Sequence, residues 1–187
     1  MKNYNEVDLV NGLRQGDTSV LKEIYRIYRP KIFAYLVRLS GSYDIAEDLS
    51  SEVWCRVATK SKIIREDTNL GAWLFTIARN LFFSYCRWRN TEDKYAGALA
   101  RLSFEKSESA TPYHKAVVKE QKQLLEKGLS LIGPKYREAL ILVGIEGFSC
   151  PEAAKICEIQ EPAMRKRISR AKGLLKQVIS EISGLKN

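Results

Sequence analysis

Residues 149–180 read SCPEAAKICEIQEPAMRKRISRAKGLLKQVIS, and they carry the clearest structural signal in the second half of the chain. Its first residues predict a helix start, because Ser149 can cap the helix and Glu152, three residues later, can reach back to the cap. A second helix opens at Pro162, a residue that suits a first helical turn. Two short helices joined by about four residues are typical of a helix-turn-helix.

The helix that follows Pro162 has one apolar face and one basic face. At about 100° per residue, the apolar face collects Met164, Ile168, Ala171, Leu175 and Val178. The opposite face collects Arg165, Lys166, Ser169, Arg170 and Gly173. A membrane-surface helix would need Trp, Phe or Leu beside its basic face, and these are lacking. A solvated basic surface remains an alternative, but the pattern favours a recognition helix that enters the major groove of DNA.

The composition of the whole chain agrees with a polyanionic partner. The 187 residues include 31 Lys and Arg against 22 Asp and Glu, a formal net charge of +9. Such an excess favours nucleic acid first and an anionic membrane second. The polar start carries no signal peptide pattern, and the uncharged runs are well short of the ~20 residues of a membrane span. We therefore expect a cytoplasmic protein without membrane insertion.

The cysteines and the single histidine, His114, offer little basis for a metal or catalytic site. The four cysteines are Cys55, Cys86, Cys150 and Cys157, and no two of them form a Cys-x-x-Cys pair. We expect them to be buried or half-buried apolar residues, as free cysteines usually are. No zinc ligand set and no Cys-His or Ser-His arrangement can be assembled from them, so we expect no cofactor, no metal and no catalytic residue.

Upstream of the helix-turn-helix, the chain divides into three parts by pattern and charge. Residues 1–90 and 115–187 show helical periodicity and carry net charges of +4 and +6. The pattern fails over residues 91–114, where the net charge is −1 and the composition is that of a linker. The apolar run 139–145 has strand-like content, but no turn signal precedes it and it is interpreted as helix. The sequence thus predicts an all-α protein of two small helical domains joined by a flexible linker.

Local signals place the helices of the first domain. Gly16 ends a first helix, and Asp17 caps the next one. Pro30 is expected to break or kink that second helix, because proline lacks the amide proton that the helix needs. Asp44 is expected to cap a third helix, and a fourth spans about residues 70–88.

Acidic side chains crowd the predicted third helix of this basic protein: Asp44, Glu47, Asp48 and Glu52. Favourable charges at a helix N-terminus could account for them, and this alternative stays open. The functional interpretation is a docking face for a basic protein partner, formed by Glu47, Asp48, Ser51 and Glu52.

The predicted helix at residues 70–88 is unusually aromatic. Trp73, Phe82 and Trp88 are expected in the core. An outward face carries Arg79, Asn80, Phe83 and Arg87, and the polar loop before the helix adds Lys60, Lys62 and Arg65. Basic and amide groups interleaved with an exposed aromatic ring suit single-stranded nucleic acid, whose unpaired bases stack on such rings.

Three motifs together resemble the extracytoplasmic-function (ECF) sigma factors of bacteria. These are DIAEDLSSEVW at residues 44–54, AWLFTIARN at 72–80 and RISRA at 167–171. The resemblance covers most of the chain and implies an initiation subunit of RNA polymerase, with no catalysis of its own. Its first domain would bind the clamp helices of core polymerase and melt the minus-10 element, and its second would read the minus-35 duplex.

The resemblance also assigns roles to individual residues. Asp48 and Ser51 fall at the clamp-docking positions. The loop of residues 60–69 and Asn80 fall where the family holds a flipped non-template base. The promoter-facing side of the recognition helix corresponds to Arg165, Lys166, Ser169 and Arg170. Apart from the resemblance, Glu161 near the groove could read cytosine or repel phosphate. The resemblance further implies association with the nucleoid and an anti-sigma factor as partner, which could hold the protein at the membrane.

The chain departs from the family pattern at several positions. Ser51 stands where the family usually has Gln, and Pro162 lies in the three residues that replace Gly-Thr-Val. Glu158 replaces the turn glycine and would cost about 1 kcal/mol if its φ is positive. One alternative is a helix-turn-helix regulator that is not a polymerase subunit. Another is an enzyme such as a metal-dependent nuclease, but the acidic cluster lacks partners from a second segment.

Overall fold

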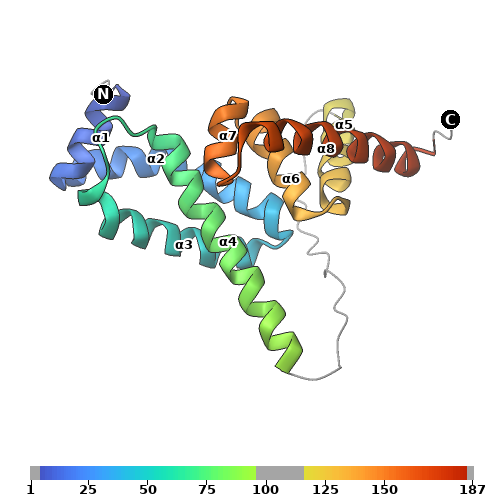
Figure 1. The fold of residues 1–187 in the computed structure, drawn as a ribbon, viewed down its shortest axis with the longest axis horizontal. Helices are drawn as coiled ribbons and strands as arrows, with labels where there is room; N and C mark the ends of the chain where they lie inside the picture. Colours follow the sequence, from blue (N-terminus) through green and yellow to red (C-terminus); the bar gives the residue numbers. More distant parts are fainter. Residues whose placement is uncertain (1–4, 96–115, 185–187) are drawn as a thin grey trace. The chain divides into compact units, whose positions relative to one another are not determined.

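The computed structural model describes residues 5–95 and 116–184. Within these residues every regular element is helical and no strand occurs (Figure 1). The chain separates into two compact units, Met1–Ser103 and Phe104–Asn187. The predicted all-α architecture with two helical units is confirmed. The first residues assigned to the linker are helical, and the rest of it, with His114, lies outside the described residues.

The first unit begins with two well-capped helices, a short one and a long one. Its elements are α1 (Glu6–Gln15), α2 (Thr18–Ser40), α3 (Tyr43–Lys60), the 3-10 turn η1 (Ser61–Ile63) and α4 (Leu70–Tyr95). Gly16 ends α1 in the left-handed conformation, with φ at 76°. The Asp17 carboxylate accepts a hydrogen bond of 2.8 Å from the amide of Ser19, so both signals are confirmed. Glycine suits the left-handed position 16 because it has no Cβ to clash with the backbone.

The structure corrects two local expectations in this unit. Helix α2 is not broken at Pro30 but continues through it, because the missing amide removes only one hydrogen bond while Ile32 and Leu36, both fully buried, hold the second half in the core. The cap of α3 is Ser42, whose hydroxyl accepts from the amide of Ile45 at 3.4 Å. Asp44 lies in the first turn of α3, where its charge favours the helix dipole.

The core of the first unit forms between α2, α3 and α4. The Tyr35 and Phe75 rings meet edge to face at 5.1 Å between centroids, and both side chains are buried. Of the aromatic residues expected in the core, Phe82 is buried, Trp73 is half-buried and Trp88 is 57% exposed. The prediction for Trp88 is wrong because the C-terminal half of α4 extends past the helices that cover its beginning (Figure 1).

The second unit is a compact set of shorter helices. Its elements are α5 (Ala116–Leu131), α6 (Pro134–Leu140), the π-helical turn η2 (Ile141–Ile145), α7 (Cys150–Ile156) and α8 (Glu161–Ile182). The helical interpretation of residues 139–145 is thus confirmed. Helices α5 and α8 approach closely at Gly128, where an added Cβ would lie 2.9 Å from Cδ1 of Leu175 and 3.2 Å from Cγ1 of Ile179.

Helices α7 and α8 form the predicted helix-turn-helix. The Ser149 amide donates to Oε2 of Glu152 at 2.8 Å, and the Ser149 hydroxyl accepts from the Glu152 amide at 3.4 Å. Glu158 in the turn has a φ of 55°, so a non-glycine residue does occupy a left-handed position. Met164 and Ala171 of α8 are fully buried, which confirms its predicted inner face. Among the helices of residues 5–95 and 116–184, none has the length and apolar content needed to cross a membrane.

Candidate polymerase and promoter interfaces

Helix α3 presents its acidic side chains to solvent. Its inner face is packed through Ala46, Leu49 and Val53. The outer face exposes Asp44, Glu47, Asp48, Ser51 and Glu52. Nε of Arg56 lies 2.9 Å from Oε1 of Glu52, which balances that charge. The unneutralised part of the acidic face therefore centres on Glu47 and Asp48.

The same outer face of α3 carries Cys55, which is exposed. The expectation of burial is wrong for this cysteine, because it lies four residues after Ser51 and shares its side of the helix. It holds for the other three, of which Cys157 is buried and Cys86 and Cys150 are half-buried.

The loop between α3 and α4 is anchored at its beginning and exposed beyond it. Ser61 and Ile64 are buried, and the Ser61 hydroxyl donates to the carbonyl of Ala58 at 3.0 Å. The basic residues assigned to nucleic acid are all exposed: Lys60, Lys62 and Arg65. Nε of Arg65 lies 3.1 Å from Oδ1 of Asp67, so part of this positive charge is matched within the loop.

Three of the four residues expected on the outward face of α4 lie together. Nη1 of Arg79 donates to Oδ1 of Asn80 at 2.9 Å, and its guanidinium carbon lies 5.0 Å from the centroid of the Phe83 ring. All three are half-buried, whereas Arg87 is exposed. The Phe83 ring also packs against Phe82 at 5.2 Å between centroids. Arg79, Asn80 and Phe83 therefore form a cluster fixed by mutual contacts, and only Arg87 of the predicted outward face is exposed to solvent.

Helix α8 exposes the polar face that the angular pattern predicts. Its half-exposed to exposed residues include Glu161, Arg165, Lys166, Ser169 and Arg170. Nε of Arg165 donates to Oε1 of Glu161 at 2.9 Å. This hydrogen bond and the charge of Glu161 raise the pKa of Arg165 above its ordinary value. Lys166 and Arg170 extend the positive charge along the first turns of α8, where major-groove contacts are made in a helix-turn-helix.

Two buried charged residues that pack behind the helix-turn-helix were not identified from the sequence. Arg137 and Glu138 follow one another in α6, and both are buried. Nη2 of Arg137 donates to the carbonyls of Ser130 at 2.8 Å and Ile132 at 3.1 Å, at the end of α5. Burial lowers the pKa of Arg137 below its ordinary value. The signal available in the sequence was a charged pair directly before an apolar run, which periodicity alone leaves unassigned.

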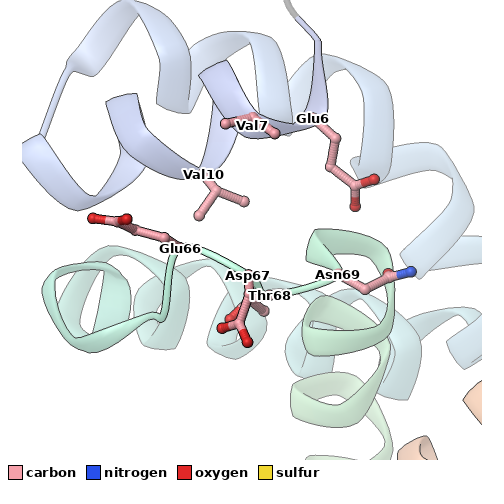
Figure 2. A pocket seen from close by; sticks show the side chains of 7 residues that line it. All are labelled: Glu6, Val7, Val10, Glu66, Asp67, Thr68 and Asn69. Atoms are coloured by element: carbon pink, nitrogen blue, oxygen red, sulfur yellow. The ribbon is translucent and has the colours of Figure 1, made fainter.

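No metal centre emerges from the part of the chain that the structure describes, since no three His, Cys, Asp or Glu side chains converge there. A hollow of about 250 Å³ lies between α1 and the loop before α4 (Figure 2). It is lined by Glu6, Val7, Val10, Glu66, Asp67, Thr68 and Asn69. The loop assigned to the minus-10 element is therefore also a neighbour of α1.

Comparison with known proteins matches each unit to a recognised sequence family. Residues 24–91 match the family described as Sigma-70 region 2, and residues 122–175 match Sigma-70, region 4. These two ranges contain the acidic face of α3, the α4 cluster and the exposed face of α8.

Similarity also extends over most of the chain. It is 35% identical over 150 residues to the ECF RNA polymerase sigma factor EcfG of Rhodopseudomonas palustris, covering 80% of each chain. It is 28% identical over 156 residues to the ECF RNA polymerase sigma factor SigM of Bacillus subtilis, covering 83% of this chain and 93% of SigM. Among solved structures, the sigma factor RpoE of Bartonella quintana, in complex with the anti-sigma factor NepR, matches with a TM-score of 0.72 and 31% identity. That match covers 85% of this chain and 96% of RpoE.

Proposed function

Because this chain belongs to the ECF RNA polymerase sigma factors and is an alternative sigma factor that directs promoter-specific transcription, we propose a division of labour between its two units. The first unit docks on the clamp helices of core polymerase and melts the minus-10 element. The second unit reads the minus-35 element as duplex DNA. The observation that carries this proposal is the opposite charge of two exposed helix faces, acidic on α3 and basic on α8.

The acidic face is the proposed polymerase contact. Glu47, Asp48, Ser51 and Glu52 lie on the exposed side of a helix whose opposite side is packed, so the whole face is available to a partner. Complementary charge speeds encounter and sets the register of a protein–protein interface. A row of carboxylates would repel DNA, which supports a protein partner here.

Promoter DNA meets two different surfaces. Melted minus-10 DNA is assigned to Lys60, Lys62, Arg65, Arg79, Asn80, Phe83 and Arg87, which combine charge with an aromatic ring. Duplex minus-35 DNA is assigned to Glu161, Arg165, Lys166, Ser169 and Arg170. Arginine pairs with guanine edges through two parallel hydrogen bonds, and exposed Lys and Arg side chains also contact phosphates.

The remaining partners follow from this role. Polymerase carries out the chemistry, so we assign no catalytic residue, metal or cofactor to this chain. An anti-sigma factor is the proposed regulator, supported by the similarity to RpoE, which was solved in complex with NepR. The proposed location is the cytoplasm, where polymerase and promoters are.

The test is transcription with core RNA polymerase and the full chain on a library of random promoters. The expected result is a set of transcripts whose templates share one minus-35 and one minus-10 sequence. Co-purification of core polymerase with the tagged chain is measured in parallel. A helix-turn-helix regulator that is not a polymerase subunit would bind DNA without core, and neither transcripts nor co-purification would be seen.

A further inference from the structure

Two polar contacts join helix α1 to the minus-10 loop, residues 60–69, and to the start of α4 directly after it. Oε1 of Glu6 accepts a hydrogen bond of 2.9 Å from the amide of Leu70, the first residue of α4 and 64 positions away in the chain. Further back in the loop, Arg14 forms an ion pair with Glu66. Figure 2 shows Glu6 above the start of α4 and Glu66 towards the other end of the loop.

Between these two points the loop is poorly packed. The hollow of about 250 Å³ separates α1 from the segment that runs from Glu66 to Asn69. Val10, on its wall, is 1% exposed, but Val7 is 59% exposed and covers little of the loop. Apolar burial anchors the chain on both sides of this segment, at Ile64 and at Leu70. The residues between them, 65–69, are exposed or half-buried, so their conformation depends mainly on polar contacts.

The contact of Glu6 is the stronger of the two on physical grounds. A carboxylate that accepts from a backbone amide at a helix N-terminus gains both a charge-assisted hydrogen bond and a favourable helix dipole. The Leu70 amide is fully buried with its residue, so removal of this acceptor would leave an unmet donor. The ion pair of Arg14 with Glu66 is solvent-exposed on the glutamate side, 73% for its side chain, and contributes less.

The surroundings of Glu6 join it to the same corner of the fold. Burial raises the pKa of Tyr28 above its ordinary value, and the negative charge of Glu6 adds to this effect. Gly71, in the first turn of α4, lies against Tyr28, since a Cβ added there would be 3.6 Å from the Tyr28 hydroxyl oxygen. Glu6 thus binds the start of α4 and acts electrostatically on Tyr28 of α2, at the point where the loop ends.

We propose that Glu6 and Arg14 are positioning residues for minus-10 selection. Helix α1 holds the loop in the conformation that receives the flipped base, and it does so without contacting the promoter. This inference rests on the proposed function, in which the loop and Asn80 bind that base. Promoter choice would then depend on side chains more than 50 positions upstream of Asn80 in the chain.

The test uses holoenzyme assembled from core polymerase and the full chain. Initiation is measured on promoters that carry each of the four bases at every minus-10 position, with a constant minus-35 element. Glu6→Ala should reduce discrimination among minus-10 bases by roughly three- to tenfold, a fraction of what a charged hydrogen bond supplies. Glu6→Gln keeps an acceptor oxygen and should restore most of the discrimination. Preference at the minus-35 element and affinity for core polymerase should stay unchanged in both.

A charge exchange tests the second contact without relying on Glu6, and it remains informative if Glu6→Ala fails to fold. Arg14→Glu and Glu66→Arg should each reduce minus-10 discrimination. The double variant should recover part of it, because the ion pair re-forms with reversed polarity.

Asn80→Ala separates failure of this inference from failure of the proposed function. Unchanged discrimination in Glu6→Ala, Arg14→Glu and Glu66→Arg, with discrimination lost in Asn80→Ala, would overturn the role of α1 alone. If Asn80→Ala and a loop variant with Lys62→Ala and Arg65→Ala also kept full discrimination, the assignment of the minus-10 surface itself would be wrong.

Discussion

Nη1 of Arg167 lies 3.9 Å from Oε2 of Glu138, whose side chain is completely buried. Glu138 belongs to α6 and Arg167 to α8, so the contact ties the inner side of the proposed recognition helix to the core of its unit. Arg165 and Lys166, immediately before Arg167, point to solvent. This charge contact therefore adds to the packing of Met164 and Ala171 in orienting the exposed basic face.

Replacement of Arg167 by Met should destabilise the chain by about 3 kcal/mol, because it leaves the buried carboxylate of Glu138 without this counter-charge. The free energy of unfolding would be measured with urea on the full chain, following helical circular dichroism. Arg165→Met is the matched control on the exposed face and should change stability by less than about 0.5 kcal/mol. Equal effects of the two substitutions would contradict the structural role of Arg167.

Asp48→Arg should abolish binding to core polymerase, since it reverses a charge at the centre of the acidic face. Affinity for core would be measured with labelled full-length chain. Minus-35 duplex binding by the second unit should persist in the same variant. Glu181→Arg makes the same charge change on α8 and is expected to bind core normally. If Asp48→Arg bound core polymerase with wild-type affinity, the assignment of the docking face would be wrong.

Arg170→Ala should weaken recognition of the minus-35 element by about 1–3 kcal/mol for each base that the arginine no longer reads. The measurement is holoenzyme affinity for promoters with single substitutions across that element. Discrimination should relax at one position of the DNA. Lys176→Ala lies further along α8, and we expect at most a uniform decrease in affinity across all sequences. An unaltered sequence preference in Arg170→Ala would refute the assignment.

Glu158→Gly should stabilise the chain by about 1 kcal/mol, because glycine adopts the left-handed backbone without the strain that a Cβ causes. The change would appear as a higher urea midpoint for unfolding of the full chain. Glu158→Ala keeps the Cβ and should leave the midpoint close to that of the wild type. A lower midpoint for the glycine variant would show that the turn does not carry this strain.

The capping box of α7 predicts a dependence of stability on pH. Hydrogen bonds from the side chain and backbone of Ser149 lower the pKa of Glu152. A lowered carboxyl pKa stabilises the fold above the unfolded value of about 4.3, and this contribution is lost as pH falls through the lower folded value. The stability advantage over Glu152→Gln should therefore be present at pH 7 and vanish in acid. A difference in stability between the wild type and Glu152→Gln that stays constant from pH 7 into acid would contradict the prediction.

Features set by a few neighbouring residues could be predicted from the sequence. The cap at Asp17 and the box between Ser149 and Glu152 follow from side chains that reach only two or three positions, and the left-handed stop at Gly16 follows from the backbone freedom of glycine. The faces of α8 follow from helical periodicity in the same way. The exposed α3 and α8 faces of the candidate interfaces were accessible to this reasoning.

Predictions were less successful where the outcome depends on how the helices and side chains pack against one another. Trp88 has the same spacing as the core residues before it but lies on a part of α4 that other helices leave open. Pro30 has a helix-breaking side chain, but packing of the residues after it outweighs one missing hydrogen bond. Arg79 shares an exposed-looking pattern with Arg87 yet is held by Asn80 and Phe83.

The order of residues within a few turns is enough to specify most of the helices, several of their caps and the two charged faces. Tertiary packing, in contrast, is what brings Glu6 to Leu70 and Arg167 to Glu138. Both contacts join residues far apart in the chain, and no local periodicity encodes them. They arise when apolar faces pack and bring polar groups together in places where burial makes each partner matter.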